Sequence, residues 1–77
     1  MAEGEYIQAI TAYDEASKVN PRFNVAYYNR GNAYFRLDQY ERSIQDFDEA
    51  IRLEPDHEGY REAKDEVVKL AQSASGV

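Results

Sequence analysis

Apolar residues recur along this chain at three- and four-residue intervals, in four segments separated by short polar breaks. This spacing is typical of amphipathic α-helices. Pro21 and Pro55 end the first and third segments, because the residue before a proline is pushed out of the helical region and proline cannot continue the helix. The pattern therefore predicts an all-α fold. The four expected helices cover residues 5–19, 24–37, 40–53 and about 56–72.

The first and third segments repeat each other at a spacing of 34 residues. The residues that are identical across this spacing are Tyr6 and Tyr40, Ile10 and Ile44, Asp14 and Asp48, Glu15 and Glu49, Ala16 and Ala50, and Pro21 and Pro55. Other paired positions hold similar residues, such as Tyr13 and Phe47. A period of this length is typical of a stacked repeat protein, in which each unit buries its apolar face on a neighbour. We therefore expect the function to be that of holding another protein.

The second segment is apolar on two sides, which predicts a helix that packs between two neighbours. The two sides carry Tyr27, Gly31 and Tyr34, and Tyr28, Asn32 and Phe35, respectively. Glycine inside a helix costs roughly 1 kcal/mol relative to alanine, so we expect another helix to approach closely at Gly31. Asn24 is expected to cap this helix, and the carboxylates of residues 38–41 are expected to cap the third helix as a capping box does.

Residues 24–57 closely resemble one complete tetratricopeptide repeat, a helix–turn–helix unit of 34 residues. The matching residues are Tyr27, Gly31, Tyr34, Ser43, Phe47, Ala50 and Pro55. Three positions depart from the usual pattern of this family: Tyr27 stands where tryptophan is common, Ser43 where alanine is common, and Arg30 where leucine is more frequent. The resemblance implies a piece of a helix-turn-helix solenoid with four helices.

The same resemblance divides the chain into four parts. Residues 1–23 match the second half of a preceding repeat, 24–57 form the complete repeat, 58–72 form a more polar C-terminal capping helix, and 73–77 form a flexible tail. The first helix of the preceding repeat is absent, so one apolar side of the first segment lacks its cover. Either the chain is a piece of a longer protein, or two chains supply each other's missing surface. Exchange of helices between two copies would then give a homodimer.

In this family, one side of the second helix faces a concave groove that cradles a peptide segment of a partner protein. The resemblance places Tyr28, Asn29, Asn32, Phe35 and Arg36 on that side. The asparagines could bond a peptide backbone, the two aromatic rings could supply apolar contact, and the arginine could meet a carboxylate. The alternative for this patch is packing against a neighbouring helix. The expected function is a non-catalytic scaffold or adaptor; a self-associating homodimer is the alternative.

One subgroup of the family clamps the C-terminal carboxylate of chaperones with lysine, asparagine and arginine side chains. Asn29 matches the asparagine of that clamp. The next helix should then offer cations to the groove, yet the corresponding positions are Gly59 and Ala63, flanked by Glu58 and Glu62. This departure argues against a receptor for chaperone tails and favours a neutral or basic ligand segment.

Composition narrows the possible partners. Nine basic and fifteen acidic residues give a net charge of −6, whereas binding a phosphate backbone needs clustered Lys and Arg. We therefore expect no nucleic-acid partner. No stretch approaches the roughly 20 apolar residues of a membrane helix, and no secretory signal is visible. A cytoplasmic location is the default expectation.

No group of residues predicts catalysis, a cofactor or a metal site. His57 is the only histidine and has no second nitrogen ligand near it in the sequence, so it is expected in a loop, with a contact at the rim of the ligand site as its functional alternative. No serine has a histidine partner arranged for nucleophilic work, and the four glycines form no phosphate-binding loop. The acidic residues of the first and third helices are expected to face solvent: Asp14, Glu15, Asp46, Asp48 and Glu49.

Overall fold

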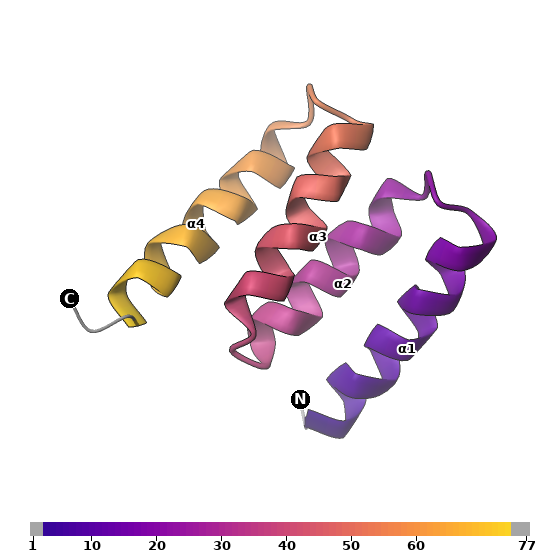
Figure 1. Cartoon of the computed structure of the whole chain (residues 1–77), viewed down its shortest axis with the longest axis horizontal. Helices are drawn as coiled ribbons and strands as arrows, with labels where there is room; N and C mark the ends of the chain where they lie inside the picture. The colour runs from indigo at the N-terminus through magenta and orange to yellow at the C-terminus, as the bar shows by residue number, and fades with distance from the viewer. Residues whose placement is uncertain (1–2, 75–77) are drawn as a thin grey trace.

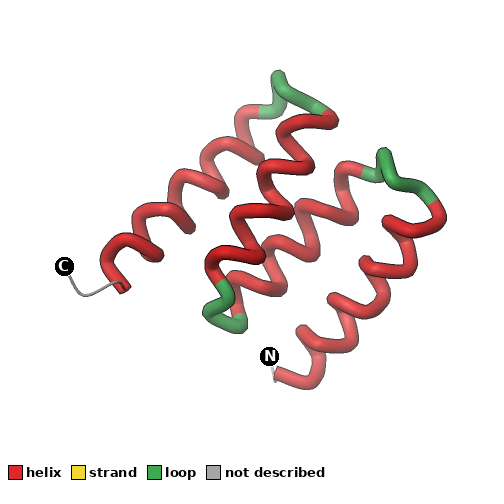
Figure 2. Tube along the Cα trace, viewed as in Figure 1, coloured by secondary structure: helices red, strands yellow, loops and turns green. Residues whose placement is uncertain are grey.

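A computed structural model of the chain describes residues 3–74. This part is entirely helical apart from short turns, as the sequence pattern predicts (Figures 1 and 2). The helices are α1 (Glu3–Val19), α2 (Asn24–Arg36), α3 (Tyr40–Leu53) and α4 (Glu58–Ala74). A flexible tail is expected at residues 73–77; of these, 73 and 74 are helical, and 75–77 lie outside the described residues.

The four helices lie side by side in chain order and alternate in direction (Figure 1). Each one packs against the next, and α1 and α4 occupy opposite edges of the stack. The stack measures 40 × 32 × 16 Å. Its thinnest dimension is little more than one helix diameter of about 10–12 Å, so the molecule is an open row of helices. A closed four-helix bundle, the alternative all-α arrangement, is not formed.

The closest approach in the row joins α2 to α3 at Gly31. A Cβ atom on this glycine would lie 2.8 Å from a ring carbon of Phe47 and 3.3 Å from the Cβ of Asp46. The hydroxyl of Ser43 donates a hydrogen bond of 2.8 Å to the Gly31 carbonyl. Because Phe47 and Ser43 are both buried, this contact is the centre of the fold. The predicted close approach at the glycine is confirmed.

The core is narrow and lies away from the N-terminal helix. Its buried apolar residues are Ala26, Ala33, Phe47, Ala50, Tyr60 and Val67. None of the residues of α1 is buried. This helix is held by one neighbour, α2, whereas α2 and α3 each have a neighbour on both sides.

Both predicted N-terminal caps are wrong. Asn24 is already the first residue of α2; the position before it is Phe23, and no side chain caps the helix. The Asn24 amide instead donates hydrogen bonds to Glu54 and, over 3.2 Å, to the Tyr60 hydroxyl. These bonds join α2 to the turn after α3 and to α4, so long-range contacts replace the local capping role of the amide.

The start of α3 likewise lacks a side-chain cap. Asp38 has a φ of 60°, in the left-handed region that aspartate tolerates better than most residues. Its carboxylate accepts a hydrogen bond of 3.3 Å from the Tyr40 hydroxyl. Desolvation and this carboxylate raise the pKa of Tyr40. The turn therefore depends on backbone conformation rather than on a capping box.

Candidate functional site

A hollow of about 310 Å³ lies between α1 and α2, and we call it the α1–α2 hollow. One wall comes from α1 and the other from α2. Its lining residues are Tyr6, Ala9 and Tyr13 of α1, and Asn29, Asn32, Ala33 and Arg36 of α2. The α1 wall consists of two tyrosines and an alanine, and the α2 wall presents two amides and a guanidinium. Such a surface combines apolar area with a few polar groups that can orient a ligand.

The α1–α2 hollow brings together three of the five residues that the resemblance assigned to a groove, namely Asn29, Asn32 and Arg36. Both asparagine side chains are half-buried. Each amide can donate two hydrogen bonds and accept others. Because neither side chain is fully buried, part of each amide can reach a ligand.

The other two groove residues pack against neighbouring helices. The Tyr28 ring lies 5.6 Å from that of Phe47 and 4.9 Å from that of Tyr60, measured between centroids. The Phe35 ring lies 5.9 Å from that of Tyr40. Both side chains remain half-exposed. Packing against a neighbour, the alternative that the sequence left open, thus describes the contacts that Tyr28 and Phe35 make within the chain.

The strongest electrostatic feature is a network around Arg30. Its guanidinium donates two hydrogen bonds to Asp46, of 2.8 and 2.6 Å, and a third to Asp14, of 2.6 Å. The Asp46 hydrogen bonds, opposed by desolvation and assisted by Asp14, raise the pKa of Arg30 above its already high usual value. One side chain of α2 thus ties together α1, α2 and α3.

The prediction that Asp46 faces solvent is wrong, because this residue is 5% exposed. Asp14 is also half-buried rather than free. The signal that could have found this network is Arg30 itself, a cation where the family prefers leucine, with a carboxylate 16 residues to either side of it. A buried charge requires a charged partner, and Arg30 is the cationic partner of both Asp46 and Asp14.

A second ion pair repeats the first one along the chain. Lys64 of α4 lies 2.6 Å from Asp48 of α3, as Arg30 of α2 lies 2.6 Å from Asp14 of α1. Each partner of the second pair stands 34 residues after its counterpart in the first. The same contact therefore links each unit to the next. A second hollow of about 300 Å³ adjoins the second pair, and most of its lining residues are charged: Asp48, Ile51, Arg61, Lys64 and Asp65.

His57 lies in the turn before α4, as expected. Its ring stacks on that of Tyr60 with 3.8 Å between centroids, and its Nδ1 accepts a hydrogen bond of 3.3 Å from the Tyr60 backbone N–H. This histidine therefore caps α4. Among residues 3–74, no group of three His, Cys, Asp or Glu side chains is placed to hold a metal ion.

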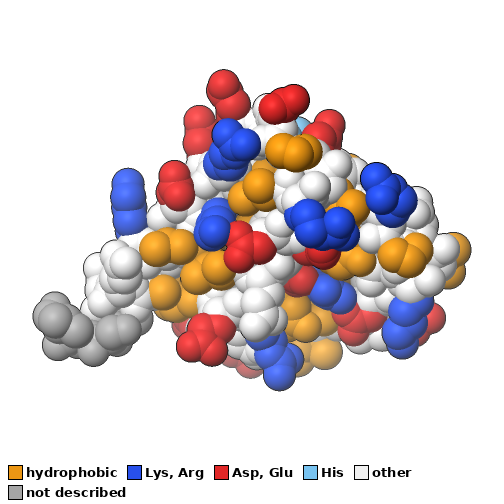
Figure 3. All heavy atoms as spheres, turned by 45° about the horizontal axis from the view of Figure 1, so that its top comes forward, with side chains coloured by type: hydrophobic (Ala, Val, Ile, Leu, Met, Phe, Trp, Pro, Cys, Tyr) orange, Lys and Arg blue, Asp and Glu red, His pale blue; other side chains and the backbone are white. Residues whose placement is uncertain are grey.

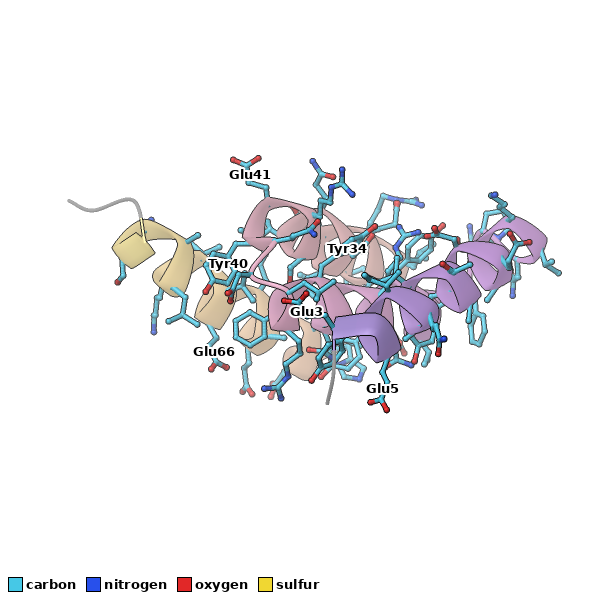
Figure 4. The ribbon with its side chains drawn as sticks, turned by 90° about the horizontal axis from the view of Figure 1, so that it is seen from below. Glu3, Glu5, Tyr34, Tyr40, Glu41 and Glu66 are labelled. Atoms are coloured by element: carbon cyan, nitrogen blue, oxygen red, sulfur yellow. The ribbon has the colours of Figure 1, made fainter. Side chains whose placement is uncertain are left out.

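Acidic side chains project from both sides of the row. Figure 4 shows Glu5 of α1 and Glu66 of α4 pointing to one side, and Glu41 of α3 pointing to the other. In the view that brings the α1–α2 and α3–α4 turns forward, apolar side chains form small patches separated by acidic and basic ones (Figure 3). No helix in the described part is both long and apolar enough to cross a membrane.

Comparison with known proteins identifies the family. The family model described as "Tetratricopeptide repeat" matches residues 25–57, and that described as "TPR repeat" matches residues 1–38. The chain is 34% identical over 55 residues to the tetratricopeptide repeat and J domain-containing co-chaperone DNJ1 of Cryptococcus neoformans, and 38% identical over 57 residues to the small glutamine-rich tetratricopeptide repeat-containing protein 2 of Saccharomyces cerevisiae. These matches cover 71% and 74% of the chain.

The chain spans only a small part of its relatives: 10% of the co-chaperone and 16% of the yeast protein. A UDP-N-acetylglucosamine--peptide N-acetylglucosaminyltransferase of Giardia intestinalis is 38% identical over 56 residues, which cover 73% of this chain and 4% of that enzyme. Similarity is therefore confined to the repeats and extends to proteins of different activities. The chain belongs to the tetratricopeptide repeat family, whose repeats are in general protein–protein interaction modules.

Proposed function

We propose that this chain is a non-catalytic interaction module that receives a segment of a partner protein in the α1–α2 hollow. The observation that carries the proposal is the lining of that hollow, where Asn29, Asn32 and Arg36 face the aromatic wall of α1. The amides would bond polar groups of the segment, and the aromatic wall would take an apolar side chain. The half-exposed rings of Tyr28 and Phe35 would extend the contact along α2.

Arg36 lines the hollow itself, but carboxylates at the two edges of the row favour a segment that is neutral or basic outside this contact. Glu5 and Glu66 project to the same side of the row from its two edges (Figure 4), and both are exposed. A segment with a lysine or arginine toward its ends would meet these carboxylates. Complementary charge of this kind mainly increases the rate of association and the specificity.

The network around Arg30 supports a rigid binding surface. It joins the three helices that form and back the α1–α2 hollow, so the two walls keep their spacing before a ligand arrives. A preorganised surface spends less ordering entropy on binding. The mechanism that we propose is therefore docking onto a prepared surface.

The test is a peptide-display selection on the intact chain, followed by calorimetric titration of a selected peptide. The variant Asn29→Ala with Asn32→Ala removes both amides while keeping good helix formers in α2. We expect at least tenfold weaker binding with unchanged helicity. Gln45→Ala, an exposed amide on α3, is the matched control and should bind as the parent chain does. Equal affinity for the double variant and the parent would refute the assignment of the site.

Self-association is a second candidate, and α1 is the observation that favours it. No residue of this helix is buried, and Ile7 is 56% exposed. Two copies could cover each other's α1 and form a homodimer. Sedimentation equilibrium from micromolar to hundreds of micromolar chain would reveal it as a concentration-dependent mass, whereas a constant monomer mass would remove this candidate. A cytoplasmic location and the lack of nucleic-acid partners stay predictions from composition.

A further inference from the structure

Two turns lie at the same end of the row of helices, the α1–α2 turn (residues 20–23) and the α3–α4 turn (residues 54–57) (Figure 1). They stand one repeat apart and share their backbone hydrogen bonds. In the first turn, the N–H of Asn20 donates to the Ala16 carbonyl over 2.9 Å, and the N–H of Phe23 donates to the Asn20 carbonyl over 3.0 Å. The equivalent bonds of the second turn measure 3.0 and 3.2 Å. One backbone pattern therefore carries two different sets of side chains.

Opposite charges occupy an equivalent position in the two turns. Arg22 of the α1–α2 turn stands where Asp56 stands in the α3–α4 turn, and the neutral Asn20 stands where Glu54 stands. Arg22 and Asp56 are both exposed. Neither forms an ion pair with another residue of the described part of the chain. This end of the row therefore presents a cation at one turn and a carboxylate at the other.

The α1–α2 turn also exposes apolar side chains. Val19, the last residue of α1, is 86% exposed, and Phe23 is 41% exposed. Phe23 occupies the N-cap position of α2 and makes no capping bond, although Ser, Thr, Asn and Asp stabilise a helix start best at this position. Its counterpart His57 does cap its helix, because its Nδ1 accepts a hydrogen bond from the backbone N–H of Tyr60. The start of α2 therefore does not explain the phenylalanine.

We propose that this end of the row binds a second copy of the chain and forms an end-to-end dimer. The twofold axis would lie between the two turns, along the thin dimension of the row. It would place the α1–α2 turn of each copy opposite the α3–α4 turn of the other, so that Arg22 of one copy meets Asp56 of the other at two symmetric contacts. A twofold interface has to be self-complementary in this way. The exposed Val19 and Phe23 would supply apolar area beside the charge pairs.

The charges favour a second copy over other occupants. An anionic membrane would attract Arg22, but as an extended surface it would also meet the carboxylates at and next to the second turn, Glu54, Asp56 and Glu58. A basic protein segment would suit the second turn and not the first. A second copy carries both charges at a spacing of one repeat, so it complements the whole end of the row.

The end-to-end dimer does not depend on the function proposed above. The residues that line the α1–α2 hollow reach Tyr6 near the start of α1 and Arg36 at the end of α2, at the opposite end of the row from the two turns (Figure 1). The hollow would therefore stay open in the dimer. The two turns cover only part of an end that is 16 Å thick, so we expect less than the about 800 Å² per partner of a standard-size interface and a weak dimer.

Reversal of the charges tests the proposal. Sedimentation equilibrium of the intact chain, from tens of micromolar to one millimolar, should show a mass that rises toward that of two chains. Arg22→Asp and Asp56→Arg each place like charges at both symmetric contacts, and each should weaken association at least tenfold. An equimolar mixture of the two variants restores opposite charges at both contacts, so it should form a heterodimer with an affinity near that of the parent chain. A parent mass that stays at one chain, unchanged association of the single variants, or a mixture that stays monomeric would each overturn the proposal.

Phe23→Asn separates the contact from the fold. Asparagine is a good capping residue at this position, so the variant should melt at a higher temperature than the parent chain while it associates at least fivefold more weakly. Unchanged association would overturn the apolar part of the contact. Lys69→Glu reverses an exposed charge near the far end of α4 and should associate as the parent chain does. Ile7→Lys, on the exposed face of α1, should also leave association unchanged; a loss of the dimer with this variant would assign the interface to α1 and refute the end-to-end arrangement.

Discussion

Replacing Arg30 by leucine tests how far the fold depends on the buried carboxylate of Asp46. The Asp46 side chain is 7% exposed and accepts both of its hydrogen bonds from Arg30. Removal of one partner of a buried ion pair leaves an uncompensated charge and costs about 3–5 kcal/mol. We expect the lower end, about 3 kcal/mol, because Asp46 lies on a thin row of helices close to water.

The size of the chain makes this loss easy to measure. At about 0.05–0.15 kcal/mol per residue, a domain of this length has a free energy of unfolding of roughly 4–12 kcal/mol. A loss of about 3 kcal/mol should lower the melting temperature by roughly 12–24 °C, at about 4–8 °C per kcal/mol for domains of this size. Circular dichroism at 222 nm during thermal and urea unfolding would show both changes.

A double-mutant cycle separates the ion pair from packing. Asp46→Ala alone should cost only about 1–2 kcal/mol, because Arg30 keeps its bond to Asp14 and is still partly exposed. The variant with both Arg30→Leu and Asp46→Ala replaces the pair by apolar groups and should lie within about 1 kcal/mol of the parent chain. The expected coupling between the two sites is therefore about 3–5 kcal/mol in magnitude.

Two outcomes would contradict this reasoning. The first is an Arg30→Leu variant as stable as the parent chain, and the second is a double variant whose loss equals the sum of the single losses. Arg61→Leu provides the control, since this arginine of α4 is exposed and surface substitutions usually change stability by less than about 0.5 kcal/mol.

Three further predictions follow from single contacts. Gly31→Ala should destabilise the protein by about 1 kcal/mol in urea unfolding, because overpacking against the Phe47 ring outweighs the roughly 1 kcal/mol gain in helix propensity. Gly4→Ala is the control: open space surrounds Gly4, so this variant should be as stable as the parent chain or more stable. Burial and, to a smaller extent, Glu54 raise the pKa of Tyr60, so folding favours the protonated side chain. This contribution to stability is complete below about pH 10 and is lost as the pH rises further. The melting temperature should therefore fall less steeply above about pH 10 in Tyr60→Phe than in the parent chain. His57→Ala removes the capping bond and the stacked ring at the start of α4; hydrogen exchange should show faster exchange in its first turn, and unchanged protection there would contradict the capping role.

The sequence predicts the fold well because its strongest signals are local or periodic. Pro21 and Pro55 end helices by their covalent structure, whatever surrounds them. The 34-residue period implies that whatever packs in one unit packs again in the next, and the repeated ion pair between successive units bears this out. Gly31 adds one tertiary contact, since a glycine inside a helix requires a reason for its cost.

The misplaced residues are those whose surroundings come from distant parts of the chain. Asn24 has the side chain of a good cap, but Glu54 and Tyr60 compete for its amide across 30 or more residues. Asp46 has the sequence context of a solvated acid, and only Arg30 on the facing helix explains its burial. Helical periodicity alone contains no information about either of these contacts between distant residues.

The same distinction explains the limits of the site prediction. Asn29, Asn32 and Arg36 line the α1–α2 hollow because one helical face presents all three, and the family resemblance assigned that face to the groove. Whether a ring on that face contacts a ligand or a neighbour depends on the next helix, and α4 brings Tyr60 against Tyr28.

Equivalent residues of α1 and α3 differ in burial, and this difference explains why the α1–α2 hollow is open. Similar residues at equivalent positions are closed to solvent in α3 and open in α1, so sequence pattern alone does not bury a surface; a covering helix does. In a repeat protein, a surface of this kind is buried only where the next helix of the stack lies on it. The α1 surface differs from that of α3 by Ala9 for Ser43, Tyr13 for Phe47 and Ala12 for Asp46. With Ala12 in place of Asp46, the α1 surface has no counterpart to the carboxylate that Arg30 meets on α3.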